Sequence, residues 1–434
     1  MGGIETFSAH FQRVSRTLPA VIRRTREAAF ARFTDLGFPT TRMEDWKYTN
    51  VAPITKIPFQ LPNGSPHVSR TDVAGASFPA ECQLVFVNGR YSPSLSAPGS
   101  LPPGVRVESL AAVLERQPAL LEPHLARYAD YASQSFTALN TAFIADGAFV
   151  SLAKGTTAPA PIHLLFLATA PGAATVAQPR NLILAEEGST ATVVESYVGL
   201  GPDTYFTNSV TEIPIGPRAR ITHYKVQRES AAAFHVASVV AHQEAASHFV
   251  SHSVSLGGAL VRSDTGTVLD AEGSDCTLEG LYMVTGTQHV DHHTAIDHRQ
   301  PRCRSRELYK GVLDGRSSGV FNGKVVVRPD AQKSDAAQVN RNLLLADAAA
   351  IDTKPQLEIF ADDVQCRHGA TIGRLDAAAI FYLRSRGIGQ ANARALLIYA
   401  FANELLSRMQ VAPVRKQLEG VLSGRFHRHL EVET

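Results

Sequence analysis

The feature that most constrains the fold is a stretch of roughly 200 residues or more, from about Phe136 to Thr371, in which short alternating strands predominate. β-Branched residues alternate with polar residues between glycines, and no helical stripe interrupts them. A doubly wound α/β fold needs a helix after nearly every strand, so this pattern excludes that fold. A sandwich, a barrel or a β-solenoid remains.

Three segments of this stretch are imperfect copies of one another. They begin at Leu184, Ile213 and Ala271, and each contains a short strand, a corner with glycine and a second alternating strand. Imperfect repeats favour a solenoid, whose turns bury a continuous core only by stacking on one another. We therefore expect a mainly β protein with a parallel β-helix as its core.

The segments on either side of this core have helical patterns. Near the N-terminus, Phe7, Phe11, Val14 and Leu18 recur on one stripe of a helix, and Pro19 suits the first turn of the next helix.

A further helix is expected over about 107–131, and the last 60 residues return to helix, including a short one that Pro413 opens. A helical unit after a solenoid either caps its last turn or docks a partner. The expected division is therefore a helical and irregular region over 1–133, a β-helix over 134–374 and a helical domain over 375–434.

Composition excludes several classes of function. The 42 Lys and Arg residues nearly balance the 40 Asp and Glu residues, which argues against a nucleic-acid or anionic-membrane binder. No apolar run approaches the roughly 18 residues that span a bilayer. Four scattered cysteines and the lack of a secretory segment predict a cytoplasmic protein.

Familiar catalytic motifs are absent or lie in the wrong context. The sequence contains no phosphate-binding loop, dinucleotide fingerprint or His-Glu-x-x-His zinc motif. The segment Gly315–Gly319 matches the nucleophile-elbow spacing, but a strand rather than a helix follows Ser317. We expect Ser317 to lie in a solenoid corner.

The densest histidine cluster extends from His289 to His298. On a strand, His289, Asp291 and His293 share one face, while His292 and His298 point to the opposite side. The first three could hold iron or zinc. The alternative, which the pattern favours, is a ladder of polar side chains hydrogen-bonded to adjacent turns.

A second candidate site is the pair Cys366 and His368. Two residues apart on a strand, they point the same way and lie roughly 7 Å apart. A thiolate and an imidazole suit zinc, copper or an iron–sulfur cluster, but such centres generally need four ligands. If this pair binds metal, the missing ligands come from elsewhere in the fold or from a second chain.

Several long motifs around these residues resemble the SufB/SufD family, the scaffold subunits of the SUF iron–sulfur cluster assembly machinery. The resemblance extends over about 136–409. Its motifs are Ser334–Leu345, Thr353–Ile359, Asp363–Thr371 and Phe381–Ile388, and Met43–Thr49 and Gly369 are similar to the D-type branch.

This resemblance implies a right-handed parallel β-helix flanked by an N-terminal helical region and a C-terminal helical domain. It implies pairing with a SufB paralogue through the β-helix, binding of the ABC-type ATPase SufC through the C-terminal helices, and a B–C2–D complex, with a homodimer possible for the isolated chain. The family's interface ligands map onto Cys366 and His368.

The resemblance therefore predicts a non-enzymatic scaffold in which a transient iron–sulfur cluster is shared with the partner and no cofactor is tightly bound to the isolated chain. ATP hydrolysis would come from SufC. Cys276 and Cys303 are expected to be buried thiols rather than sulfur acceptors.

The sequence leaves three other functions to consider beside the scaffold. The chain could be a purely architectural partner whose Cys366 and His368 ligate nothing. It could be a self-contained metalloprotein that uses His289, Asp291 and His293. A β-helix enzyme acting on polysaccharide is disfavoured, because only 7% of residues are aromatic and no secretory segment is present.

Overall fold

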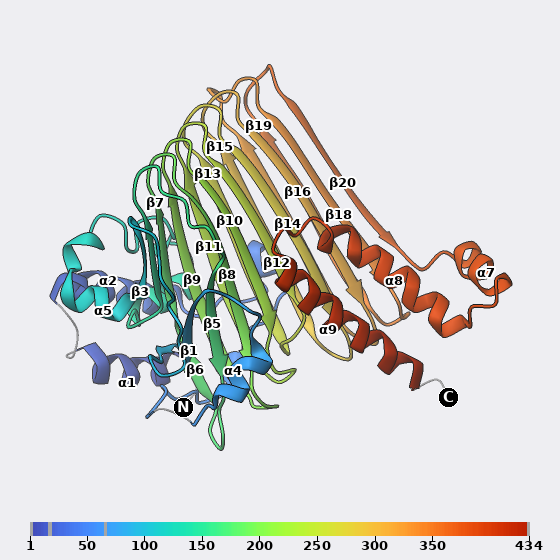
Figure 1. The fold of residues 1–434 in the computed structure, drawn as a ribbon, viewed down its shortest axis with the longest axis horizontal. Coiled ribbons are helices and arrows are strands. Elements are labelled where there is room, and N and C mark those ends of the chain that lie inside the picture. The colour runs from blue at the N-terminus through green and yellow to red at the C-terminus, as the bar shows by residue number, and fades with distance from the viewer. Residues whose placement is uncertain (1–2, 16–19, 65–66, 432–434) are drawn as a thin grey trace.

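The alternating segments form two β-sheets that lie face to face, as Figure 1 shows for the computed structural model of this chain. The structure describes residues 3–15, 20–64 and 67–431, so Leu18 and Pro19 lie outside the described residues. Each turn of the chain adds one strand to each of the two sheets. The result is a parallel β-solenoid of about eight turns. The expected mainly β fold with a parallel β-helix core and helical flanks is confirmed.

The strands stack in a regular order. The first sheet contains, in spatial order, β2 (Arg90–Tyr91), β1 (Cys82–Val87), β5 (Ile162–Ala168), β8 (Thr190–Gly199), β10 (Arg220–Arg228), β12 (His248–Ser255), β14 (Asp275–Val284), β16 (Arg304–Leu313), β18 (Asp335–Leu344) and β20 (Gln365–Gly373). The second sheet contains β19 (Ala350–Ile359), β17 (Ser318–Val327), β15 (His289–His298), β13 (Leu260–Leu269), β11 (Phe234–Gln243), β9 (Tyr205–Ile215), β7 (Arg180–Ala185), β4 (Ala148–Leu152) and β3 (Val105–Ser109), with β6 (Thr175–Ala177) beside β9.

Tight corners join the two sheets. Gly188, between β7 and β8, has φ 67°, and Gly273, between β13 and β14, has φ 74°. Glycine adopts this backbone conformation more readily than any other residue, although Arg218 and Ala246 adopt it in two other corners. Together with Gly216, between β9 and β10, these glycines show that the three repeated segments are solenoid corners. Ser317 lies in the corner between β16 and β17, as predicted.

Residues one turn apart stack into columns along the solenoid. Cys276, Ser305, Ala336 and Cys366 form one such column in the parallel register and are 29 to 31 residues apart. Because side chains alternate between the two faces of a strand, each column lies either inside or outside the solenoid. The Cys276 column belongs to the central apolar core, which runs along the whole interior.

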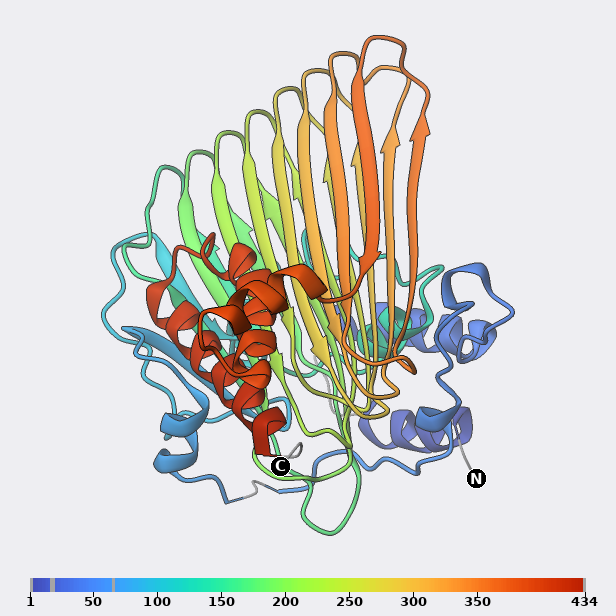
Figure 2. The ribbon, with the colours of Figure 1, turned by 90° about the vertical axis from the view of Figure 1, so that its right-hand side faces the viewer.

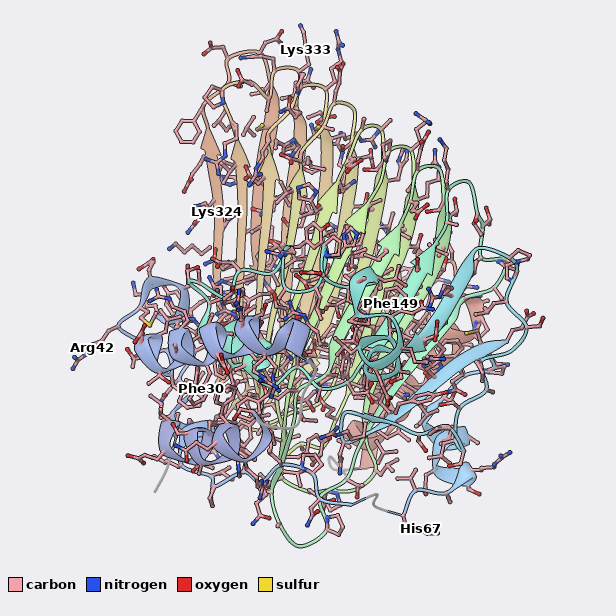
Figure 3. All side chains as sticks on the ribbon, turned by 90° about the vertical axis from the view of Figure 1, so that its left-hand side faces the viewer. Phe30, Arg42, His67, Phe149, Lys324 and Lys333 are labelled. Atoms are coloured by element: carbon pink, nitrogen blue, oxygen red, sulfur yellow. The ribbon has the colours of Figure 1, made fainter. Side chains whose placement is uncertain are left out.

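Most of the N-terminal region covers the outer face of the second sheet, but Val73 and Ala76 of the helix over Arg70–Ala76 pack against β1, β5 and β8 of the first sheet. Its helices are α1 (Ile4–Val14), α2 (Ala20–Leu36), η2 (Glu44–Trp46), α3 (Ala52–Thr55), α4 (Arg70–Ala76), α5 (Leu110–Arg116), η3 (Pro118–Leu120) and α6 (Ser135–Ala142). Phe7 of α1 and Phe33 of α2 pack in one apolar cluster with Phe206 of β9 and Phe234 of β11. In Figure 3, α1 and α2 lie in front of the lower part of the solenoid.

Two sequence expectations for this region were wrong. The helix expected over about 107–131 is a strand, β3, followed by the short helix α5, because Val105 and Val107 alternate with period two and Ser109 then caps a helix start. Helix α6 also lies at the beginning of the stretch expected to contain strands alone.

A buried ion pair joins the N-terminal region to the solenoid. Arg180 of β7 and Glu212 of β9 approach to 2.7 Å, and both side chains are completely buried. Glu212 also accepts hydrogen bonds from the backbone N–H groups of Ala126, Tyr128 and Ala129. Arg180 also donates to Asn140 and Thr141 of α6, so the pair holds both α6 and the loop before it against the early turns of the solenoid.

The C-terminal helices α7 (Ala377–Ser385), α8 (Gln390–Leu406) and α9 (Ala412–Glu431) follow β20. Ile398 and Leu405 of α8 and Leu418 of α9 pack with Tyr224 and Leu281 on the outer face of the first sheet. Figure 2 shows α8 and α9 lying across the strands, on the side opposite α1 and α2. At 20 residues, α9 is not the short helix that the sequence predicted.

Helices α8 and α9 therefore cover a sheet face, and none of the three C-terminal helices caps the last turn, which consists of β19 and β20. Most of β20 is exposed, and among the described residues no strand pairs with its outer edge. Capping of the last turn, one of the two roles expected for these helices, was wrong.

Candidate functional site

Cys366 and His368 lie on β20, at the uncovered end of the first sheet (Figure 2). In the parallel register with β18, Cys366 is opposite Ala336 and His368 is opposite Gln338. Cys366 is half-buried and packs against the central core, so its side chain faces the interior. Alternation places His368 on that same face, where it is exposed because no further turn covers it.

A buried polar column continues beneath His368. Gln338, which is 1% exposed, donates from Nε2 to Oε2 of Glu307 over 2.7 Å. Burial raises the pKa of Glu307 to about 7, although hydrogen bonds with Thr294 and Gln338 oppose the rise. His368 thus terminates a polar column inside the solenoid.

Sequence reasoning assigned no site role to Gln338 or Glu307. Their spacing carried the signal: Glu307, Gln338 and His368 are 31 and 30 residues apart, and this distance matches the length of a solenoid turn. Without the register, that spacing has no meaning, because the turn length varies along the chain.

The chemistry available at this end of the solenoid is that of a two-ligand site. Burial raises the pKa of the Cys366 thiol, while a backbone hydrogen bond from Ala336 lowers it and Asp335 raises it further. The thiol is therefore protonated at neutral pH, and metal binding must release that proton. Within the described residues, no group of three or more His, Cys, Asp or Glu side chains is placed to hold a metal ion.

The last turn of the solenoid also exposes three large apolar side chains. Ile359 at the end of β19 is 41% exposed, Phe360 is 59% exposed and Ile372 of β20 is 51% exposed. On β20, Ile372 shares the interior face with Cys366 and His368, because all three positions are even-numbered. An open end with unpaired strand edges and bare apolar side chains is a surface that other proteins cover.

The other predicted residues lie elsewhere, on the outer face of the second sheet. His289, Asp291 and His293 point away from the core, whereas His292 and His298 are buried on the inner face of the same strand. Thr49 bridges His289 and Asp291, and His293 approaches Asp291 to 3.2 Å. The structure thus brings the three together, but His289 contacts Thr49, and Asp291 contacts both Thr49 and His293.

Arg262 completes this cluster and was missed by the sequence reasoning. Its Nη1 contacts Asp291 at 2.7 Å and donates to the carbonyl of Asp45, and its guanidinium lies 4.4 Å from the ring centre of Trp46. Burial raises the pKa of Asp291, but Arg262 outweighs this effect and holds that pKa far below its usual value. The cluster anchors the segment Met43–Thr49 to the solenoid.

The remaining cysteines are buried. Cys276 and Cys303 are 0% and 1% exposed, and burial raises the pKa of both thiols. A buried neutral thiol is a poor nucleophile. Their placement agrees with the prediction that both are buried thiols.

Comparison with known families matches nearly the whole chain. Residues 166–401 match the family described as SUF system FeS cluster assembly, SufBD core domain, and residues 4–164 match the SufBD protein N-terminal region. The chain belongs to the SufBD family. The family resemblance found in the sequence is thereby confirmed.

Individual SufBD proteins align over most of their length. An iron–sulfur cluster assembly SufBD family protein of Synechocystis is 34% identical over 95% of this chain and 93% of its own length. The iron–sulfur cluster assembly protein SufD of Escherichia coli is 34% identical over 90% of both chains, and SufD of Bacillus subtilis is 27% identical over 94% of both. In the described part of this SufBD chain, no helix has the length and apolar character to cross a bilayer.

Proposed function

We propose that this SufBD protein is a scaffold subunit for iron–sulfur cluster assembly and contributes Cys366 and His368 to a cluster that forms between it and a SufB-type partner. The main support for this proposal is the position of the pair on the uncovered last turn of the solenoid. Two ligands are too few for a cluster, and a second chain stacked on the open end can supply the rest.

In this proposal the cluster is cargo rather than a resident cofactor. A site completed only at an interface is open whenever the partners separate, which suits transfer. The chain itself catalyses no reaction and works in the cytoplasm. Residues 134–374 supply the interface, residues 1–133 brace the outer face of the second sheet, and residues 375–434 dock an ATPase.

The ATPase-docking role assigned to the C-terminal helices is supported by α7. No residue of α7 is buried, and Phe381 and Tyr382 are 74% and 55% exposed. Figure 1 shows α7 projecting away from the solenoid, where a second protein can reach it. Exposed aromatic side chains are typical anchors of protein–protein interfaces.

The test of cluster ligation is co-expression with the SufB-type and SufC-type subunits of the same organism, followed by anaerobic purification. His368→Ala and Cys366→Ala should leave the complex assembled but lower its iron and sulfide content and its visible absorbance. Arg367→Ala, on the opposite face of the same strand, is the matched control and should retain the cluster.

The second candidate function is that of an architectural partner, which the exposed apolar side chains of the last turn favour. Equal cluster content in the native complex and in both site variants would establish it and refute ligation. Ile372→Asp distinguishes interface formation from ligation, because it should prevent pairing with the partner and also the homodimer of the isolated chain.

The docking role of α7 has its own test. Phe381→Ser should abolish or strongly weaken co-purification of the SufC-type ATPase, because it removes a solvent-exposed anchor without opening the core. Leu120→Ser, at an exposed site in the N-terminal region, is the control and should bind normally. Undiminished binding by Phe381→Ser would refute docking through this helix.

A further inference from the structure

A cleft of about 470 Å³ lies between the N-terminal helices and the first turns of the solenoid, far in sequence from the cluster site. Its walls come from α2, from α5, from the hairpin turn after β1 and from β6. Figure 3 views the side of the molecule on which these helices lie. The volume is that of a small-molecule site rather than a protein-docking groove.

The first unusual feature of this cleft is Arg26. The side chain lines the cleft and is only 2% exposed, and its Nε donates to the carbonyl of Ala142. The guanidinium carbon lies 5.7 Å from the ring centre of Phe11. No carboxylate among the described residues pairs with this buried cation, although buried charges in proteins are normally paired.

The second feature is independent of the first. Gln178 also lines the cleft and is 9% exposed. Its Oε1 accepts a hydrogen bond from Asn208, whose amide nitrogen also donates to the carbonyl of Phe136, so the orientation of both amides is set. The Nε2 of Gln178 is then buried without an acceptor.

The other charged groups at the cleft do not satisfy these donors. The carboxylate of Asp146 is already occupied by Ser109 and by the backbone N–H groups of Tyr91 and Ala111. Glu115 and Arg90 are exposed and lie where solvent reaches them. Two of the residues that line the cleft thus carry buried donors, and neither carboxylate among the lining residues is a free buried acceptor.

The rest of the lining is largely apolar. Leu61, Leu114, Phe143 and Val176 contribute side chains to the same cleft. A ligand that satisfies both the donors and these walls needs acceptor oxygens with negative charge at one end and a hydrocarbon body at the other.

We infer that this cleft binds a small organic carboxylate with an apolar body, its carboxylate held by Arg26 and Gln178. A single carboxylate has enough lone pairs for both donors, and its one negative charge balances the guanidinium. The site is independent of the proposed cluster ligation, because none of its residues belongs to the last turn.

Calorimetric titration of the full chain with hexanoate tests the inference. Hexanol has the same hydrocarbon body without the charge, and inorganic phosphate has charge without the body. Both should bind at least about tenfold more weakly than hexanoate, since each lacks one of the two matching features.

Two variants connect binding to the named donors. Arg26→Met should weaken hexanoate binding by about 30-fold or more, and Gln178→Leu by about tenfold. Arg42→Met is the control, because Arg42 is exposed, does not line the cleft and points outward into solvent in Figure 3, so the substitution should change nothing.

The melting temperature without ligand separates a binding role from a structural one. If Arg26 only supports the fold, Arg26→Met will lower the melting temperature and hexanoate will not raise that of the native chain. Absence of hexanoate binding at millimolar concentration, or equal binding by native chain, Arg26→Met and Gln178→Leu, would overturn the inference.

Discussion

His368 of β20 lies directly over Gln338 of β18 in the parallel register of the first sheet. Gln338 is buried, whereas His368, in the same column, is exposed, because the solenoid ends after β20. The end of the stack therefore converts an interior position into an accessible one. On the same strand, Cys366 is only half-buried, so the two candidate ligands differ in their exposure to solvent.

His368→Ala should leave the stability of the isolated chain within about 0.5 kcal/mol of native, since an exposed side chain is removed. Gln338→Ala, one turn below, should cost about 1–3 kcal/mol, because Glu307 loses its buried donor. Urea unfolding of both variants measures the difference. A large loss for His368→Ala would show that the residue supports the fold rather than facing a partner.

Glu307 should give the isolated chain a stability that falls as pH rises. Burial raises its folded-state pKa to about 7, above the roughly 4.3 of an unfolded chain, so the folded state binds the extra proton. The stabilisation that this bound proton gives to the folded state is fully present below about pH 4.3 and is lost as pH rises through 7. Glu307→Gln should therefore be more stable than native at pH 8, by about 3–4 kcal/mol, and similar to it near pH 4. Parallel pH profiles in urea unfolding would contradict this assignment.

Arg180→Met should destabilise the fold by about 3–5 kcal/mol, because it leaves the carboxylate of Glu212 buried without its cation. The matched control is Arg218→Met, which breaks the exposed pair with Glu187 and should cost no more than about 1 kcal/mol. Chemical unfolding of the two variants compares them directly. Equal losses would mean that the buried pair contributes no more than a surface pair.

Thr49→Val should loosen the segment Met43–Thr49, because the hydroxyl no longer bridges His289 and Asp291. A loss of about 1–3 kcal/mol is expected for a buried partner left unsatisfied. Limited proteolysis should detect faster cleavage near residue 45 than in native protein. Tyr48→Phe is the control, since Tyr48 is 42% exposed, and unchanged cleavage of Thr49→Val would refute the anchoring role.

Much of the candidate site could be predicted from local patterns. Alternation alone placed Cys366 and His368 on one face of a strand, and it placed His289, Asp291 and His293 opposite His292 and His298. The ligand role of Cys366 and His368 stays a proposal. Gln338, Glu307, Arg262 and Thr49 were not predicted as their neighbours, because each contact joins residues from different turns or from distant segments.

The boundary between strand and helix around Ser109 could not be predicted from the local sequence pattern. Val105–Ser109 has strand alternation, but the apolar residues that follow it suit a helix, and pairing with β4 decides where one ends and the other begins. A five-residue strand is stable only when it pairs with a sheet, and that pairing joins residues far apart in the sequence.

Periodicity and glycine placement in the chain determine the solenoid, because alternation defines an inner and an outer face and positive φ at the corners permits the turns. The tertiary structure alone decides which positions stay open. The C-terminal helices pack across the first sheet rather than on its end, so the last turn is uncovered and His368 reaches solvent. Residues about 30 positions apart stack on one another, and only the position in this stack decides whether a side chain is buried or exposed. No local sequence pattern encodes that position.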